Sequence, residues 1–248
     1  MKQALSILVL LFLNLSVIKG QDAKEIVKKA DDNMQGLSNY TELTIKIVRP
    51  TWQREMKMRS WSKGTEYSMI IIDEPVKDKG TVFLKRKKEI WNWIPSIDKS
   101  IKLPPSMMMQ NWMGTDFTND DLVKQSSIVN DYKHTVVGDS TIHNLDCYKI
   151  EMIPNPEAAV VWGKVIIFID KADYLQLRVE YYDEDGYLIN LMNFYDIKEM
   201  GGRTIPSRME MIPADSPDKK TVMIYNSIEF DIDIEENYFT TQSMKRVR

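Results

Sequence analysis

From Leu43 onwards, apolar and polar residues alternate with a period of two, in short runs separated by turn signals. This alternation is typical of strands that bury one face, and turns such as Lys63–Gly64 and Asp185–Gly186 favour hairpins. We count roughly ten strands with short connections, and we find no strand–helix–strand rhythm, fixed-period repeat or domain linker. The sequence therefore predicts a mainly β fold with a few helices (α+β), in which a long antiparallel meander curls toward a barrel.

Two helices are predicted. The first covers residues 22–34, where Asp22 can cap the helix, Glu25 follows three residues later as in a capping box, and Gly36 offers a stop. Its apolar residues recur at helical spacing on one face, at Ala23, Ile26, Val27, Ala30 and Met34. The second is a short helix over residues 120–125, with Asn119 or Asp120 as its N-cap.

The first twenty residues are interpreted as a secretory signal peptide. Lys2 precedes an apolar stretch over residues 4–18 that is short for a membrane span, and cleavage is expected near Gly20–Gln21. An uncleaved amino-terminal anchor is the alternative. No cysteine follows the apolar stretch, so a lipid-modified N-terminal cysteine is not expected. Residues 21–248 are then one exported domain.

Charge and cysteine usage exclude several function classes. Loss of Lys2 and Lys19 with the signal peptide would change the formal net charge from −3 to −5, which argues against a general binder of nucleic acid or anionic lipid surfaces. Cys147 is the only cysteine, so an internal disulfide is excluded. We interpret Cys147 as a buried apolar residue, with a nucleophile as the alternative.

Recognisable catalytic and metal-binding patterns are lacking in the sequence. The two histidines, His134 and His143, lack neighbours at metal-ligand spacing. The spacing of Asp116, Asp120 and Asp121 does not match a helix–loop–helix calcium site. No nucleophile elbow, phosphate loop or dinucleotide glycine pattern is present, although spacing alone leaves a Ser-His-Asp site open. The sequence thus predicts a protein that is not an enzyme and needs no metal or cofactor.

The segment Trp91 to Asp121 is unusually rich in large apolar residues for an irregular stretch. It holds three tryptophans, four methionines, three prolines and one glycine. Methionine adapts to ligands of varying shape, tryptophan adds a large apolar surface, and proline and glycine interrupt regular structure. This composition predicts an adaptable apolar binding surface, and the alternative is a hydrophobic loop folded over the core.

The stretch IWNWIPSIDKSIKLPPSMMMQNWMGTDFTNDDL resembles the exported outer-membrane lipoprotein-sorting proteins related to LolA and LolB. The matching residues are Trp91, Pro95, Ser96, Lys99, Lys102, Met113, Gly114, Thr115, Asp116, Phe117, Asp120, Asp121 and Leu122. The resemblance implies a curved antiparallel sheet that forms a half-open barrel covered by helices and loops. It also implies an interior cavity that accepts the acyl chains of a lipoprotein.

Thirteen apolar residues are predicted to bind such a ligand. A lid or rim is expected from Met107, Met108, Met109, Trp112, Met113 and Phe117. The concave face is expected to be lined by Trp52, Met56, Met58, Met69, Ile71, Trp91 and Trp93. The cargo-contacting arginine that the resemblance implies matches Arg49, Arg54 or Arg59.

The expected function is that of a monomeric periplasmic carrier for lipoprotein acyl chains or another lipid. Its partners would be an inner-membrane transporter and an outer-membrane acceptor, and nucleic acid is not among them. One alternative is an accessory module of an RND-type lipid transporter, with the Trp/Met surface as a protein interface. A hydrolase on a β scaffold is a third hypothesis. The basic run Lys85 to Lys88 is interpreted as a solvated turn, or else as a docking patch for an acidic partner.

Overall fold

The computed structural model describes residues 22–125 and 127–247, so the predicted signal peptide lies outside the described residues. In the described residues, thirteen strands form one antiparallel sheet in which consecutive strands pair, except that β6 does not pair with β7, and β1 also pairs with β13. The strands are β1 (Ser38–Arg49), β2 (Trp52–Lys63), β3 (Tyr67–Glu74), β4 (Val82–Arg86), β5 (Glu89–Ile94), β6 (Lys99–Lys102), β7 (Tyr132–Ile142), β8 (Leu145–Pro154), β9 (Lys164–Asp170), β10 (Gln176–Tyr182), β11 (Leu188–Met200), β12 (Arg203–Pro213) and β13 (Lys220–Phe230).

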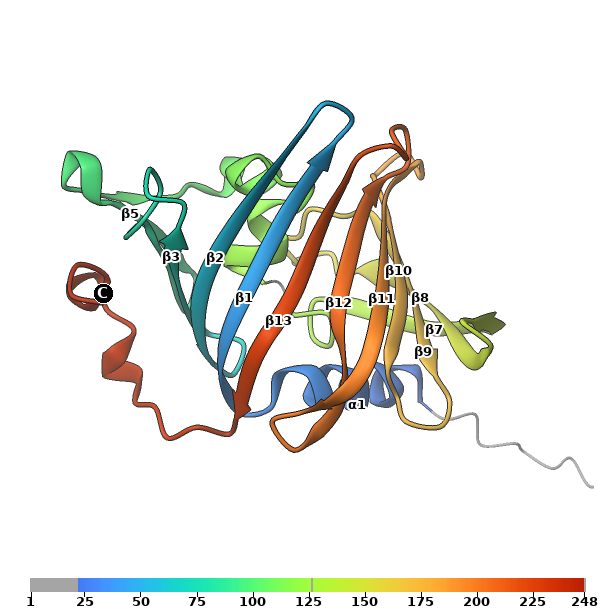
Figure 1. Cartoon of the computed structure of the whole chain (residues 1–248). Helices are drawn as coiled ribbons and strands as arrows, with labels where there is room; N and C mark the ends of the chain where they lie inside the picture. Colours follow the sequence, from blue (N-terminus) through green and yellow to red (C-terminus); the bar gives the residue numbers. More distant parts are fainter. Residues whose placement is uncertain (1–21, 126, 248) are drawn as a thin grey trace, which may run out of the picture.

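The strand order places the middle of the chain at both edges of the sheet. The order is β6-β5-β4-β3-β2-β1-β13-β12-β11-β10-β9-β8-β7, so the first and last strands pair at the centre. Strands β6 and β7 each have one neighbour, and the sheet therefore remains open. The long central strands curve as they cross the molecule (Figure 1). The predicted half-open, mainly β architecture is confirmed.

The amino-terminal helix α1 (Ala23–Gln35) lies across one end of the curved sheet (Figure 1). The Asp22 side chain caps it by accepting a hydrogen bond from the backbone N–H of Lys24 at 3.0 Å. At its other end Gly36 has a φ of 65°, a left-handed conformation that glycine adopts at little cost. Its buried residues are Ile26, Val27, Ala30 and Met34, as the helical spacing predicted.

The two faces of the sheet carry different apolar clusters. The inner face, which α1 covers, holds the main cluster, to which each long central strand contributes. The outer face near β3, β4 and β5 is covered by the carboxy-terminal segment with its short helices η5 (Glu236–Tyr238) and α2 (Thr241–Met244). There Phe239 is fully buried and Met244 is 1% exposed, so the chain end seals this part of the outer face.

Strand number and helix type differ from the sequence-based expectation. The structure has thirteen strands rather than about ten, partly because residues 82–94 form the hairpin β4–β5 with a turn after Arg86, and because β6 is a four-residue strand without clear alternation. The predicted short helix is a π-helix, η4 (Asp120–Lys124). Neither Asn119 nor Asp120 caps it by a side chain. Instead the hydroxyl of Thr118 accepts a hydrogen bond from the N–H of Asp121 at 3.1 Å.

Two further sequence interpretations bear on the fold. Cys147 is fully buried in a separate apolar cluster with Ile142, Phe168 and Leu177, and this burial raises the pKa of its thiol. In the basic run, Arg86, Lys87 and Lys88 are exposed at the β4–β5 turn, whereas Lys85 is buried.

Over the described part of the chain, no helix has both the length and the apolar character that crossing a membrane requires.

Candidate functional site: a cavity beneath the crossing segment

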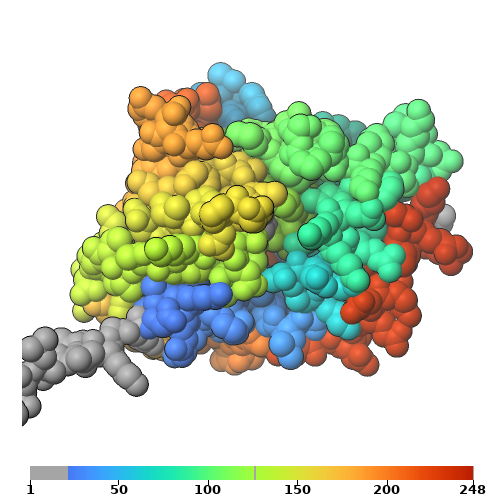
Figure 2. Space-filling view, turned by 180° about the vertical axis from the view of Figure 1, so that it is seen from behind, coloured from blue at the N-terminus to red at the C-terminus, as the bar shows by residue number. Residues whose placement is uncertain are grey.

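Residues 103–131, which we call the crossing segment, connect the two free edges of the sheet from β6 to β7. The segment runs over the inner face and carries the short helices η2 (Pro105–Met107), η3 (Trp112–Gly114) and η4. Figure 2 shows this face, with the crossing segment in green and α1 in blue. The chain thus covers the inner face of its open barrel with a segment of irregular structure.

The crossing segment is folded by hydrogen bonds among its own residues. The N–H of Trp112 donates to the carbonyl oxygen of Phe117 at 2.8 Å, and the Asn119 amide donates to the carbonyl oxygen of Met107 at 2.9 Å. The Thr115 hydroxyl donates to the carbonyl oxygen of Trp112 at 2.7 Å. Because these backbone carbonyl oxygens are paired within the segment, it can present apolar side chains to the sheet.

A buried ion pair fastens this segment to the centre of the sheet. The guanidinium of Arg49, at the end of β1, donates to both carboxylate oxygens of Asp116, over Nη1–Oδ2 and Nη2–Oδ1 distances of 3.0 and 2.9 Å. The hydroxyl of Thr221 on β13 donates to Asp116 Oδ2 at 2.6 Å and accepts from the Asp116 N–H at 2.9 Å. This contact joins the segment to the two strands at which the halves of the sheet meet.

Weaker polar contacts hold the segment at other points. Arg54 on β2 donates to the carbonyl oxygen of Met113 at 2.9 Å, and Lys85 on β4 donates to that of Gln125 at 3.1 Å. Arg59 instead forms a bidentate pair with Asp73 on the neighbouring strand, at 2.8 Å for each bond. Of the three arginines that the family resemblance left open, Arg49 and Arg54 contact the crossing segment.

Between the crossing segment, α1 and the inner face lies a cavity of about 530 Å³. This volume is within the range of ligand pockets, roughly 300–1,000 Å³. Five of its lining residues, Asp32, Gln35, Leu37, Gly64 and Thr65, are exposed at the surface. The cavity therefore opens between the end of α1 and the β2–β3 turn.

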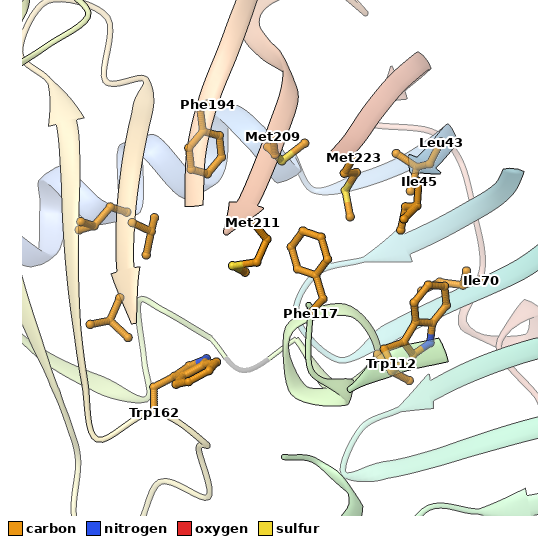
Figure 3. Packing of buried hydrophobic residues seen from close by; sticks show 14 of the residues in the cluster. Leu43, Ile45, Ile70, Trp112, Phe117, Trp162, Phe194, Met209, Met211 and Met223 are labelled. Atoms are coloured by element: carbon orange, nitrogen blue, oxygen red, sulfur yellow. The ribbon is translucent and has the colours of Figure 1, made fainter. Parts of the chain in front are cut away.

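The deep wall of the cavity is apolar and rich in methionine. Five strands contribute one methionine each, at Met58, Met152, Met192, Met209 and Met223. In Figure 3, Trp112 and Phe117 of the crossing segment face Met223, Ile45 and Leu43 of the sheet. Such a wall can adapt its shape to a flexible apolar ligand.

The structure brings seven of the thirteen predicted ligand-binding residues to the inner face. Met58, Trp112 and Phe117 line the cavity. Met56, Met107, Met108 and Met113 belong to or pack against the same apolar cluster without lining it. Trp52 and Met109 lie at the surface, 49% and 69% exposed, and Trp52 stacks with Arg49.

Four other predicted residues, Met69, Ile71, Trp91 and Trp93, lie on the opposite face, and their predicted position requires correction. They form or contact the outer cluster beneath the carboxy-terminal segment. Register explains the difference, because Met69 pairs with Trp61 on the outer face, whereas Ile70 pairs with Ser60 on the inner face. Since β3 is buried on both faces, alternation alone could not show which set faces inward.

Sequence reasoning missed most of the cavity wall. Met209 and Met223 on adjacent strands, Phe194 on β11, and Trp162 just before β9 all line the cavity. For Met209 the local signal was the alternation of Met209 and Met211 with charged residues in β12. That alternation predicts a strand, but it does not show that the strand faces a ligand. The methionines concentrated in residues 107–113 belong to the covering segment and not to the sheet wall.

Asp121 is one of two acids lining the cavity whose pKa is strongly raised, the other being Asp31. Asp121 Oδ1 accepts a hydrogen bond from Trp162 Nε1 at 3.0 Å, and its Oδ2 accepts from the N–H of Thr118 at 2.7 Å. Burial, reinforced by the neighbouring Asp120, raises the pKa of Asp121 from 3.8 to about 6 despite these hydrogen bonds. Asp121 also lines the cavity.

This pKa shift predicts a pH-dependent contribution to stability. Because the folded-state pKa lies above the unfolded value, the contribution is fully present below pH 4 and is lost as the pH rises through 6. Between pH 4 and pH 8, wild type should lose up to about 3 kcal/mol more unfolding free energy than Asp121→Asn. Urea unfolding of both proteins across this range measures the difference, and parallel curves would contradict the assignment.

Within residues 22–125 and 127–247, no group of three or more His, Cys, Asp or Glu side chains is arranged to hold a metal ion. His134 accepts or donates a single hydrogen bond, to the carbonyl oxygen of Ile128 at 2.7 Å. What the arrangement offers is a shaped apolar space with a polar mouth.

Comparison with solved structures defines the class of fold. A domain from Vibrio parahaemolyticus, described as a candidate outer membrane lipoprotein-sorting protein, matches with a TM-score of 0.80 and 22% identity over 90% of this chain and 98% of that chain. A LolA superfamily protein from Nitrosomonas europaea matches with a TM-score of 0.79 and 22% identity, over 90% and 100%. A DUF1329 family protein from Desulfovibrio piger gives 0.79 and 20%, over 90% and 100%. The chain shares the fold of these three structures.

The sequence also matches a protein-family model. A family model described as "Uncharacterized protein"-like matches residues 64–246, and the chain belongs to that family. A search of curated proteins gives no match. At 20–22% identity, the solved structures establish the fold, while the ligand has to be inferred from this chain's own cavity.

Proposed function

We propose that this protein is a non-enzymatic carrier that holds the acyl chains of a lipoprotein, or of another lipid, in the cavity beneath the crossing segment. Residues 21–248 act as one carrier domain in the periplasm, after removal of the signal peptide. The carrier receives its ligand from an inner-membrane transporter and passes it to an outer-membrane acceptor. The observation that carries this proposal is the cavity of about 530 Å³ with a methionine-rich apolar wall.

The energetics of an acyl chain require such a shelter. Each methylene gains about 0.8 kcal/mol on leaving water, so a chain of about fifteen carbons gains roughly 12 kcal/mol. Contact with Phe194, Met209 and Met223 would supply this environment without covalent chemistry. The carrier domain therefore needs only to enclose the chain and later release it.

Release depends on the contacts that hold the crossing segment. Arg49, Arg54 and Lys85 bind it through polar groups, which can exchange their partners for water when the segment moves. The sheet beneath is one continuous hydrogen-bonded structure, so we expect it to keep its shape while the segment moves. Movement of the segment alone would open the cavity along its length.

Mass spectrometry of the protein purified from its native envelope under non-denaturing conditions tests the proposal. The expected result is a mass increase that corresponds to an acylated ligand, bound at up to one equivalent. A stoichiometric protein partner without lipid would instead favour the accessory-module hypothesis, in which the exposed Trp52 and Met109 form an interface. Release of free fatty acid from an acyl ester would favour a hydrolase.

A further inference from the structure

The charged residues that line the cavity are all acidic. Among the described residues, the lining includes Asp31 and Asp32 from α1 and Asp120 and Asp121 from η4, but no lysine, arginine or histidine. The four carboxylates come from the two elements that cover the inner face, whereas the wall formed by the sheet carries apolar and neutral polar residues. The polar end of a ligand would therefore meet carboxylates.

Three lysines near the cavity are already paired, two of them with carboxylates of the cavity lining. Lys28 pairs with Asp32 on the surface of α1, and Lys124 Nζ lies 2.9 Å from Asp120 Oδ1. Lys85 Nζ donates to the carbonyl oxygen of Gln125, and burial, together with Lys124, lowers the pKa of Lys85 to about 8. None of these three lysines lines the cavity. They offset part of the negative charge but offer no open site for an anion.

The carboxylates already disfavour negative charge at each other's positions. Burial, followed by the charge of Asp32, raises the pKa of Asp31 to about 6. Burial and the charge of Asp120 have the same effect on Asp121. A phosphate or carboxylate group placed among them would add to this repulsion, because like charges in a poorly solvated site raise each other's cost of ionisation.

An unpaired hydrogen-bond donor on the same cavity wall indicates what the ligand must carry. Trp112 is 1% exposed and lines the cavity, yet its indole N–H has no acceptor among the described residues. A buried donor without a partner costs about 1–3 kcal/mol. Because the indole lines the cavity, turning the ring toward the cavity would allow this N–H to bind an acceptor of the ligand.

We propose that the cavity selects acyl esters whose polar end carries no negative charge, and that Trp112 donates a hydrogen bond to an ester carbonyl of the ligand. This inference rests on the proposed carrier function and narrows its ligand class. An acyl ester without phosphate, such as the diacylglyceryl group on a lipid-modified protein terminus, meets both requirements. An anionic phospholipid meets only the second.

Competition against a bound fluorescent acyl probe tests the charge requirement. Dioctanoylglycerol and dioctanoyl phosphatidylglycerol carry the same chains, and their affinity ratio is measured for wild type and for Asp31→Asn/Asp121→Asn. Wild type should favour dioctanoylglycerol, and the ratio should fall at least about five-fold in the variant because the repulsion is removed. Comparing ratios cancels the intrinsic difference in apolar character between the two competitors.

A second comparison tests the hydrogen bond. Trp112→Phe retains an aromatic ring but removes the donor, so the affinity ratio of dioctanoylglycerol to its carbonyl-free dioctyl ether should fall about five-fold. Any loss of packing affects both ligands equally and leaves this ratio unchanged. Circular dichroism of each variant verifies that it is folded.

The outcomes separate this inference from the carrier function. An unchanged charge ratio in the aspartate variant, or wild-type preference for phosphatidylglycerol, would overturn the proposed selectivity while leaving the carrier function intact. An unchanged ester-to-ether ratio in Trp112→Phe would overturn the assigned role of the indole. If the acyl probe does not bind wild type at all, the carrier function fails, and the inference fails with it.

Discussion

Replacing Asp116 with alanine should destabilise the protein by about 3–5 kcal/mol. The change leaves the Arg49 side chain, only 13% exposed, without its bidentate partner and removes the hydrogen bond that the Thr221 hydroxyl donates to the carboxylate. The N–H of residue 116 would persist, but the buried charge would have no carboxylate beside it. Urea unfolding measures this loss.

The same change should also free the crossing segment locally. Hydrogen exchange of the amides in residues 112–120 is expected to accelerate at least ten-fold, because the contact at the centre of the sheet is lost. Amides of β1 and β13 outside this contact should remain protected relative to global unfolding.

A matched surface pair provides the control. Lys46 and Glu55 lie opposite each other on β1 and β2 at 3.3 Å, each 45% exposed. Glu55→Ala should cost less than about 1 kcal/mol and leave exchange in the crossing segment unaltered. If Asp116→Ala behaves like Glu55→Ala, the ion pair does not fasten the segment, and opening must be controlled elsewhere.

Local sequence signals predicted the regular elements well. The helix Ala23–Gln35 has a capping aspartate, a helical apolar face and a terminal glycine, all within a stretch of fifteen residues. Hairpins such as β7–β8 and β10–β11 likewise follow from alternation and turn residues. In each case the interactions that define the element lie close together in the sequence.

The cavity could not be predicted in the same way, because it depends on contacts between distant residues. Arg49 and Asp116 are 67 positions apart, and no spacing rule relates them. Asp116 and Thr221, which complete the contact, are 105 positions apart. The sequence resemblance implied a cavity, but which strands line it depends on how the chain returns through β13 to β1.

Face assignment failed for a related reason. In β12, charged residues at Arg208 and Glu210 mark one face as the more polar. In β3, six consecutive positions are buried, since the crossing segment and the carboxy-terminal segment cover opposite faces of this part of the sheet. The alternation correctly grouped Met69 with Ile71 but could not show that the chain end would cover them.

Filling the cavity is the second change with a large expected effect. Met209 and Met223 project from adjacent strands into the space beneath Phe117 (Figure 3). In Met209→Trp/Met223→Trp, the larger side chains occupy volume that an acyl chain would use. Loss of two or three methylene contacts, at about 0.8 kcal/mol each, should lower acyl-probe affinity at least ten-fold. Stability should change by less than about 3 kcal/mol, because the added atoms enter an existing void.

Ile197→Trp is the matched control, since it adds similar bulk at a position of β11 that is 41% exposed. Titration of wild type and both variants with one fluorescent acyl probe is the most direct test of the carrier model. We expect wild type and Ile197→Trp to bind alike and the filled variant to bind at least ten-fold more weakly. Equal affinity in all three folded proteins would show that hydrocarbon is not held inside the half-barrel.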